Sequence, residues 1–278
     1  MMTENLTHYL KAWNLSGPEA LATTVTSHVY IVNVGGTRAV LKLLTDIGDE
    51  EKTGAIALRY FDGHGAVRLL RSDDQAQLLE YADGDNLVSM VKRGDDEQAA
   101  GIIAEVLNQL HSTPEKPPLD GLVSLNRWFK FLFDKAEDDR KAGINSIFIR
   151  AATHARHLLA NPQNVRVLHG DIHHENIRYR DGRGWLAFDP KGLVGERTYD
   201  AANTLCNPMN MPELVENETR ILTIASILAQ KMGIELDRML SFLYIYTCLS
   251  ASWTISDGGS GQEAINIANI VEPYVLGK

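Results

Sequence analysis

The chain has 278 residues, which is long enough to bury a sizeable core as one large domain or as two lobes. With 44% hydrophobic and 23% charged residues it has the composition of an ordinary globular protein. Its net charge of −9 argues against a general nucleic-acid binder, because phosphate contacts need clustered Lys and Arg. The same acidity would suit a cationic small substrate.

Nothing in the sequence indicates secretion or a membrane. Cys206 and Cys248 lie far apart and form no CxxC pattern, which is typical of a reducing compartment. The first residues lack the pattern of a secretory signal, and the apolar stretch 242–253 is too short to span a bilayer. We therefore predict a cytoplasmic protein without a membrane or nucleic-acid partner.

The first 82 residues predict a small β-rich lobe. Hydrophobic periodicity and turn residues predict, in chain order, a helix, two strands, a second helix and two further strands, over residues 4–13, 25–34, 39–44, 46–62, 66–70 and 77–81. Residues 16–18 are expected to break the first helix. Lys42 is informative because it is the one charged residue of its strand. Taken alone, an edge-strand lysine that blunts aggregation is the simpler interpretation.

From residue 83 the pattern becomes mainly helical. Helices are predicted over residues 95–111, 119–139, 147–159, 199–206, 213–231 and 235–253, and a flexible loop without a phosphate-binding role over 258–261. The predicted fold class is therefore α+β, with a small antiparallel β lobe carrying one packed helix (residues 1–82) and a larger helical lobe (residues 83–278). Four acids of the predicted helix 119–139 could attract a polycation: Asp134, Glu137, Asp138 and Asp139. A solvated helix face is the simpler interpretation of these acids.

A polar cluster follows the short apolar strand 165–168. Asp171 comes three residues after this strand, Asn176 comes five residues later, and Asp189 comes thirteen residues after Asn176. The residues between Asn176 and Asp189 alternate and contain a Gly turn, which predicts a β-hairpin. Because a hairpin brings its two ends together, we expect the three oxygen-bearing side chains to converge at one point.

This spacing is the pattern of a kinase catalytic loop. Such a loop places an Asp five residues before an Asn, with a second Asp downstream and a Lys on an upstream strand. Phosphoryl transfer needs a carboxylate that accepts the hydroxyl proton, hard oxygen ligands for Mg²⁺ and a cation on the nucleotide phosphates. Asp171, the pair Asn176 and Asp189, and Lys42 supply these in turn.

Several segments of the chain resemble the aminoglycoside/hydroxyurea phosphotransferase family, whose named members include streptomycin 6-kinases. They are LHGDIHHENI, GWLAFDPKGLVGE, YDAANTLCNP and the earlier LRYFDGHGAVRLLRSDDQAQLLEYADG, within a likeness that covers roughly residues 24–210. The resemblance implies a protein-kinase-like two-lobe fold, ATP and Mg²⁺ as cofactors, and a hydroxyl group of a small molecule as acceptor. An aminoglycoside such as streptomycin is the first candidate for that acceptor.

The resemblance also implies roles for single residues. Asp171 falls on the family's catalytic base, Asn176 and Asp189 on its metal ligands, and Lys42 on its nucleotide lysine. In the hinge segment LLEYA, backbone groups near Glu80 and Ala82 are expected to bind adenine. Two further residues are expected to support the site structurally: His169 and Asp200.

The sequence departs from the family at two places. The family typically carries a Glu in the small-lobe helix that pairs with the strand lysine, and here Gly54 stands at that position. Glu50 or Glu51, about one turn earlier, could replace it. The loop at residues 23–27 also lacks the glycines that usually let backbone approach phosphates, so Ser and Thr hydroxyls with backbone N–H groups would have to serve.

These features leave other functions open. The chain could be a kinase of another small metabolite, or a nucleotide-binding module without catalysis. A metal-dependent hydrolase built on His169, His173 and His174 is a further alternative. Since His173 and His174 are adjacent and normally point in different directions, and since an Asn with an Asp suits a hard cation, we expect structural roles for all three histidines.

Overall fold

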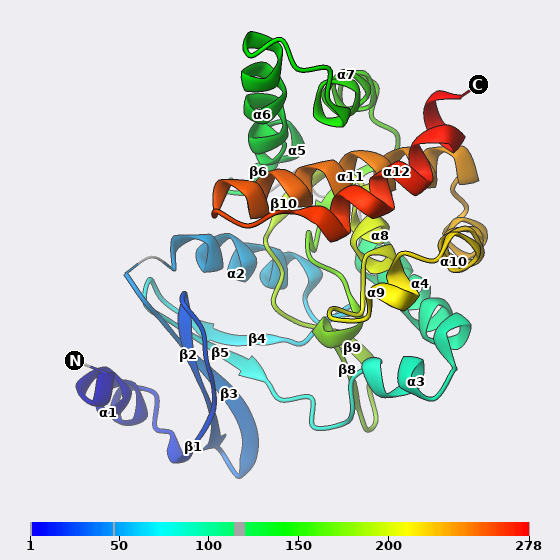
Figure 1. Ribbon diagram of the computed structural model, residues 1–278. Helices are drawn as coiled ribbons and strands as arrows, with labels where there is room; N and C mark the ends of the chain where they lie inside the picture. Colours follow the sequence, from blue (N-terminus) through cyan, green and yellow to red (C-terminus); the bar gives the residue numbers. More distant parts are fainter. Residues whose placement is uncertain (1, 47, 114–119, 278) are drawn as a thin grey trace.

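The first lobe is built on a five-stranded antiparallel sheet. The computed structural model describes residues 2–46, 48–113 and 120–277. In this lobe the strands follow the order β1-β2-β3-β5-β4, and two helices accompany them (Figure 1). Their bounds are α1 Met2–Ala12, β1 Ser16–Thr23, β2 Ser27–Val34, β3 Thr37–Leu44, α2 Asp49–Phe61, β4 Leu69–Ser72 and β5 Ala76–Glu80.

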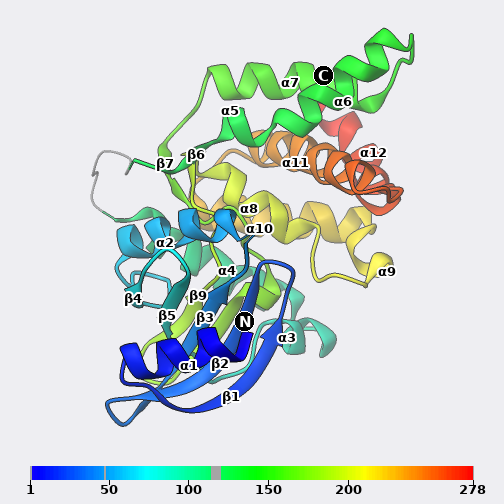
Figure 2. The ribbon, with the colours of Figure 1, turned by 90° about the vertical axis from the view of Figure 1, so that its left-hand side faces the viewer.

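The two-residue period of β3 sorts its side chains onto two faces of the sheet. Leu41 and Leu43 are buried in a cluster with Tyr9 of α1 and with Trp13, the residue that follows this helix. Helix α1 lies across the side of the sheet that faces away from the helical lobe (Figure 2). Lys42 between them therefore faces the other side, toward α2. The alternation in the sequence thus delivers one cation to the interior of the molecule.

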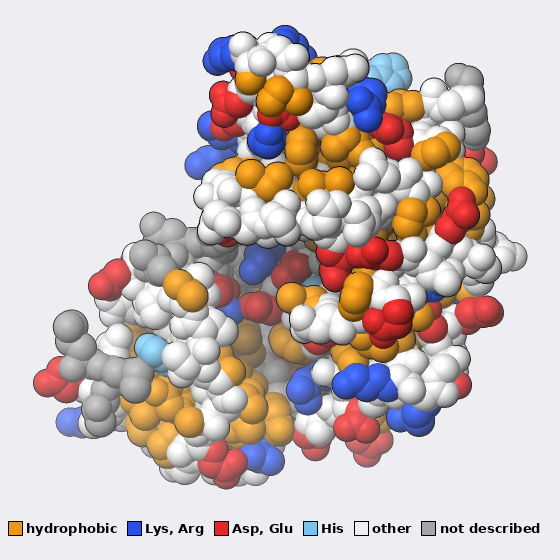
Figure 3. Space-filling model, viewed as in Figure 1, with side chains coloured by type: hydrophobic (Ala, Val, Ile, Leu, Met, Phe, Trp, Pro, Cys, Tyr) orange, Lys and Arg blue, Asp and Glu red, His pale blue; other side chains and the backbone are white. Residues whose placement is uncertain are grey.

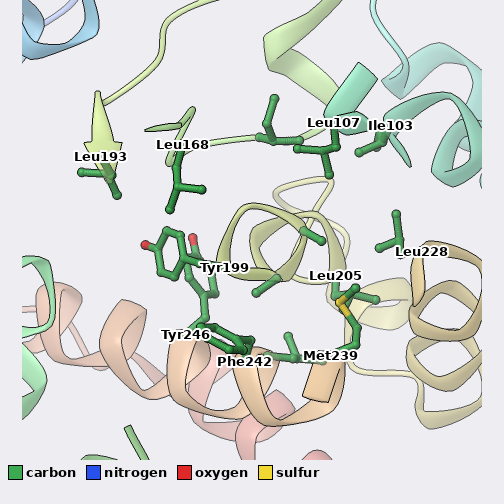
Figure 4. Close-up of a cluster of buried hydrophobic side chains, with 14 of the residues drawn as sticks. Ile103, Leu107, Leu168, Leu193, Tyr199, Leu205, Leu228, Met239, Phe242 and Tyr246 are labelled. Carbon is green, nitrogen blue, oxygen red and sulfur yellow. The ribbon is translucent and has the colours of Figure 1, made fainter. Parts of the chain in front are cut away.

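The second lobe is mainly helical and is centred on α11. This helix is buried along most of its length and packs against α7, α8 and α12; Figure 4 shows part of the core that it forms. The helices are α3 Val88–Lys92, α4 Asp96–His111, α5 Leu125–Trp128, α6 Lys130–Lys141, α7 Ile147–Ala160, α8 Thr198–Leu205, α9 Pro212–Val215, α10 Glu218–Met232, α11 Leu236–Ser256 and α12 Gln262–Leu276.

Five short strands in the second lobe carry the polar segment 169–191. They form a three-stranded sheet with the order β6-β10-β7 and a hairpin of β8 with β9. The bounds are β6 Val123–Ser124, β7 Val165–Leu168, β8 Ile177–Arg180, β9 Gly184–Ala187 and β10 Leu193–Glu196, and a 3-10 turn, His174–Asn176, precedes β8.

The hairpin of β8 and β9 fastens the two lobes together. The backbone N–H of Ala187 donates to the carbonyl of Gly65, and the N–H of Val67 donates back to the carbonyl of Ala187. On the other strand, Tyr179 exchanges backbone hydrogen bonds with the segment 84–85, which belongs to the connection between β5 and α3. The hairpin thus has backbone hydrogen bonds to the segment that precedes β4 and to the segment that follows β5.

Most long elements are confirmed, and the structure differs from the prediction at several places. Strand β1 was not predicted, because all of its residues are exposed and it contains Gly17 and Pro18. Strand β4 runs over 69–72 instead of 66–70, and α12 was not predicted at all. The predicted helix 119–139 is divided into α5 and α6, and its residue 119 lies outside the described residues.

Two expectations about the chain as a whole concern membranes and thiols. In the described ranges no helix is both long enough and apolar enough to cross a membrane. Cys206 and Cys248 are both free thiols.

Candidate active site

Lys42 lies at the centre of an ion-pair cluster that joins three segments. Its ammonium group donates to Oε2 of Glu51 on α2 at 2.5 Å and also to Oδ1 of Asp189. Lys42 and Glu51 are almost completely buried, whereas Asp189 is partly exposed. Two of the residues predicted from the sequence, Lys42 and Asp189, are therefore in direct contact across 147 positions of the chain.

The same cluster keeps Asp189 ionised. Burial by itself would raise the pKa of this carboxyl group, but the charges of Lys42 and Lys191 outweigh burial and lower it. Asp189, two residues after the end of β9, also adopts a left-handed backbone conformation, with φ 64°. An ionised carboxylate at this point is a suitable ligand for a hard divalent cation.

Glu51, and not position 54, supplies the carboxylate that pairs with Lys42. A Cβ atom added at Gly54 would lie 2.2 Å from the carbonyl oxygen of Pro190, so only glycine fits there. Because residues three apart lie on the same face of a helix, Glu51 reaches Lys42 from one turn earlier. The side chain of Glu50, the other candidate, lies outside the described residues.

Helix α2 approaches the segment after Asp189 closely at a second point. A Cβ atom at Gly192 would lie 2.1 Å from the carbonyl oxygen of Thr53. The Thr53 hydroxyl donates to the carbonyl of Lys191 at 2.6 Å. With Gly54 against Pro190, these contacts press α2 onto residues 190–192.

Hydroxyl groups shape the glycine-poor loop between β1 and β2. The N–H of Ser27 donates to the Thr24 hydroxyl at 3.0 Å, and the Thr26 hydroxyl donates to Oε1 of Glu51 at 2.7 Å. The N–H of Thr45 donates to the carbonyl of Thr26. The loop is therefore attached to the same carboxylate that holds Lys42.

Asp171 and Asn176 also lie together, as the hairpin predicts. The N–H of Phe188 donates to the carbonyl of Asn176 at 3.0 Å, which extends the β8–β9 pairing to the residue before Asp189. The amide nitrogen of Asn176 donates to the carbonyl of Asp171 at 3.0 Å and lies 3.3 Å from its Oδ2. The amide oxygen of Asn176 is thus the atom that remains for a cation.

The side chain of Asp171 is partly buried. Burial, assisted by the charge of Asp189, raises its pKa, although His173 and Lys191 oppose the rise. Nζ of Lys191 lies 4.0 Å from Oδ2, and the amide nitrogen of Asn203 donates to Oδ1 at 2.9 Å. A carboxylate whose pKa is raised is a better proton acceptor than an exposed one.

Asp200 and His169 hold the loop that carries Asp171. Asp200 accepts hydrogen bonds from the backbone N–H of His169 at 2.9 Å and of Gly170 at 2.7 Å, and from Nε2 of His111 at 2.9 Å. Burial lowers the pKa of His169 to about 4, so the ring is neutral and its Nε2 donates to the carbonyl of Phe188 at 3.0 Å. The ring thus ties the end of β7 to the end of β9.

Glu80 and Ala82 stand where β5 leaves the sheet. The buried Glu80 carboxylate forms ion pairs with Arg180 and Arg183 of the hairpin and accepts from the backbone N–H of Arg68 at 3.0 Å. Its side chain is therefore occupied inside the protein. Backbone groups are what this segment can offer to a ligand.

A cavity of about 430 Å³ opens beside Asp171. The cavity lies within the helical lobe, and Figure 3 shows in addition the hollow between the two lobes, in which acidic and basic side chains gather. Asn203 and Tyr246 line the cavity, and so do Ser260 and Glu263 from the turn and helix after α11. This wall is not predicted from the sequence, since residues 258–261 are expected to form only a flexible loop and no helix is expected over 262–276.

The acids of α6 do not line this cavity. Asp134, Glu137 and Asp139 form ion pairs with basic residues three or four positions away on the same helix. The solvated helix face, which was the simpler interpretation, therefore describes Asp134 and Glu137, while Asp139 is buried.

The three histidines serve separate contacts. Nδ1 of His173 lies 2.7 Å from Oε2 of Glu175, and burial lowers the pKa of His174 to about 4. His169 bonds to Phe188 as described above. Within the described residues no group of three or more His, Cys, Asp and Glu side chains is placed to hold a metal ion.

Comparison with known proteins gives consistent matches. The model of the family described as aminoglycoside/hydroxyurea antibiotic resistance kinase matches residues 12–258. A streptomycin 3''-kinase of Klebsiella pneumoniae is 39% identical over 253 residues, which are 90% of this chain and 92% of that protein. A streptomycin 6-kinase of Streptomyces griseus is 32% identical over 234 residues, which are 83% and 75%.

Solved structures show the same fold. Choline kinase LicA from Streptococcus pneumoniae superposes with a TM-score of 0.67 at 13% sequence identity and covers 100% of both chains. At this identity the likeness concerns the fold alone, and it identifies the protein-kinase-like two-lobe architecture.

We expect the substitution Gly54→Ala to lower the free energy of unfolding by about 1–3 kcal/mol, the usual cost of overpacking a close contact. The added methyl group would collide with the backbone carbonyl of Pro190 and push α2 away from residues 190–192. Urea unfolding measures the change.

The matched control is Gly101→Ala in the interior of α4. There a Cβ atom would meet only the flexible end of Lys231, at 3.3 Å. This variant is expected to be neutral or slightly stabilising because Ala favours a helix. Equal stability of the two variants would contradict the tight packing at Gly54.

Proposed function

The chain belongs to the aminoglycoside/hydroxyurea antibiotic resistance kinase family, and we propose that it transfers the γ-phosphate of ATP to a hydroxyl group of streptomycin. The observation that carries this proposal is the position of Asp171, which faces a cavity of about 430 Å³ on one side and has Asn176 and the pair of Asp189 with Lys42 close by. This arrangement fits a phosphoryl acceptor and a nucleotide that meet at one carboxylate.

The proposed roles follow from chemistry and position. Asp171 orients the acceptor hydroxyl and accepts its proton, for which its raised pKa is favourable. Lys42, held by Glu51, places a positive charge where the nucleotide phosphates bind. The amide oxygen of Asn176 and the carboxylate of Asp189 form a hard-oxygen donor set that fits Mg²⁺, which when bound neutralises charge on the phosphates.

We further propose that the two lobes divide the substrates. The lobe of residues 1–82 binds ATP, with the backbone near Glu80 and Ala82 contacting adenine. The lobe of residues 83–278 supplies the acid–base chemistry and the acceptor cavity. His169 and Asp200 support the catalytic loop from behind. Since ATP is the phosphate donor, we propose that the protein works in the cytoplasm.

The walls of the cavity suit a cationic acceptor. Glu263 lines it, and both burial and the negative charge of Glu216 raise the pKa of Glu263. A guanidinium group, such as those of streptomycin, would relieve this repulsion between like charges. We propose the 3''-hydroxyl as the first position to test, because the relative named for that position matches this chain at 39% identity.

Catalysis fits the structure better than simple nucleotide binding. The module without catalysis was suggested by the absence of a Glu at position 54, but Glu51 pairs with Lys42 at 2.5 Å. The ion pair between a strand lysine and a helix carboxylate that kinases require is therefore present, with the carboxylate at position 51 and not at position 54.

Replacing Glu51 by Gln is expected to raise the KM for ATP by about tenfold, the effect of losing a charge-assisted hydrogen bond. Lys42 would keep Asp189 as a partner but lose the carboxylate that directs it toward the nucleotide. Initial rates at varied ATP concentrations measure the effect.

Glu19→Gln is the control, because it removes the same charge from an exposed ion pair with Arg38 in the same lobe. Exposed pairs of this kind contribute little. If both variants have the KM of the wild-type protein, Glu51 does not position Lys42 for ATP.

The substitution Asp171→Asn is expected to reduce kcat by about 10²- to 10⁴-fold, the usual contribution of a positioned base. Binding of ATP, measured by calorimetry, is expected to remain. A variant with full activity would remove Asp171 from this role.

In the wild-type protein kcat should fall as the pH drops through a value above the ordinary carboxyl pKa. Burial raises the pKa of Asp171, and only the ionised form accepts a proton.

The acceptor is tested by a panel of streptomycin, other aminoglycosides and hydroxyurea, with ADP release as the readout. We expect turnover with streptomycin, and NMR of the product should place the phosphate on the 3''-hydroxyl. The Asp171→Asn protein is the background control. Turnover of another compound without any turnover of streptomycin would overturn the choice of acceptor but not the reaction type.

A further inference from the structure

We infer that Asn203 is a positioning residue for Asp171, and that Tyr246 fixes the amide of Asn203 in the orientation this requires. Asn203 lies on α8 and donates from Nδ2 to Oδ1 of Asp171 at 2.9 Å. This contact directs Oδ2 toward Asn176, at 3.3 Å from its amide nitrogen. The inference rests on the proposed role of Asp171 as the proton acceptor.

The orientation of the Asn203 amide is determined by its other end. Oδ1 of Asn203 accepts from the Tyr246 hydroxyl at 2.6 Å and from Nδ2 of Asn207 at 2.9 Å. The Asn207 nitrogen must be a donor, because it also donates to the backbone carbonyl of Asn203 at 2.9 Å. The end of Asn203 that it faces is therefore the oxygen, and the NH₂ group must face Asp171. A flipped amide would place its oxygen against the carboxylate oxygen of Asp171 and its nitrogen against the amide nitrogen of Asn207.

Tyr246 is suited to be a permanent donor. It is buried, and burial raises the pKa of its phenol well above the ordinary value, so the hydroxyl keeps its proton. Its ring packs edge-on against Tyr199 of α8 with 5.8 Å between ring centroids, and Figure 4 shows the two tyrosines side by side between α8 and α11. The donor is therefore fixed in place as well as in protonation state.

The network continues away from the site to an ion pair. The carbonyl of Asn207 accepts from Nη2 of Arg220 at 2.8 Å, and Arg220 forms a bidentate pair with Asp96 of α4. Asn203 is thus attached to α11 through Tyr246 and to α4 and α10 through Asn207. A side chain held from three helices loses little entropy when it orients a carboxylate.

Helix α8 supports the catalytic loop at two points one turn apart. Asp200 accepts from the backbone of residues 169 and 170, and Asn203, three positions later, holds the side chain of Asp171. The first contact fixes where the loop lies. The second fixes how the reacting carboxylate is turned, which the backbone contacts alone leave free.

The test compares steady-state kinetics of Asn203→Leu, Tyr246→Phe and the double variant with ATP and streptomycin. We expect kcat to fall by about 10- to 100-fold for Asn203→Leu and by about three- to tenfold for Tyr246→Phe, since hydrogen bonds to charged groups contribute more than neutral ones. Because Tyr246 acts through Asn203, the double variant should be no slower than Asn203→Leu alone. The KM for ATP should stay within about twofold.

Tyr244→Phe is the matched control. It removes a hydroxyl from the same helix, where Tyr244 donates to Glu272 at the same distance of 2.6 Å but does not contact Asp171. Its kcat should equal that of the wild-type protein. Thermal unfolding of each variant checks that it is folded, and if Asn203→Leu does not fold, the comparison of Tyr246→Phe with Tyr244→Phe decides.

Several outcomes would overturn the inference. Equal kcat for Tyr246→Phe and Tyr244→Phe would remove the orienting role of Tyr246. Effects that multiply in the double variant would mean that Tyr246 and Asn203 act independently. A change confined to the KM for streptomycin would assign both residues to acceptor binding, since both line the cavity.

A crystal structure of Asn203→Leu or Tyr246→Phe provides a readout that needs no acceptor. We expect the Asp171 carboxylate to turn away from the direction that Asn203 imposes, and an unchanged carboxylate would contradict the inference.

The role of Asp171 as base and the positioning role of Asn203 and Tyr246 can fail separately. Full activity of Asp171→Asn would remove the base itself, whereas loss of activity in Asp171→Asn with normal kinetics of Tyr246→Phe would remove only the positioning role.

Discussion

The contact of one buried ammonium group with two carboxylates determines how the lobes face each other. Lys42 comes from the sheet, Glu51 from α2 and Asp189 from the hairpin of the helical lobe. A buried lysine is tolerated only when its charge is compensated, so the cluster requires all three segments to be in place at once. The Thr26 hydroxyl on Glu51 adds the loop between β1 and β2 to the same unit.

The part of the site that could be predicted is the part that is local in sequence. The spacing of Asp171, Asn176 and Asp189 around a hairpin is sufficient to bring them together, because strand pairing has a fixed register. Long helices such as α4 and α7 were predicted nearly to the residue, since their apolar faces follow the helical period. Lys42 was identifiable because a charge inside an apolar strand needs a reason.

What could not be predicted depends on contacts between distant segments. Nothing in the sequence near Glu51 distinguishes it from Glu50, and the choice is made by where α2 meets Lys42. Asn203 looked like one residue in a helix, and its role depends on Tyr246, 43 positions later. The cavity wall at 260–263 is missed because the loop 258–261 is visible in the sequence, but its place beside Asp171 depends on how α12 packs on α11.

The close packing of Gly54 and Gly192 has a consequence for exchanging α2 between related proteins. A Glu at position 54 cannot coexist with the carbonyl of Pro190 where it lies here, and a side chain at 192 cannot coexist with the carbonyl of Thr53. Helix α2 and residues 189–192 therefore fit each other so closely that a side chain larger than Gly at either position requires a change in the opposite segment. Chimeras with relatives that carry Glu at position 54 should be built by exchanging both segments at once, since either segment alone would meet a surface shaped for a different partner.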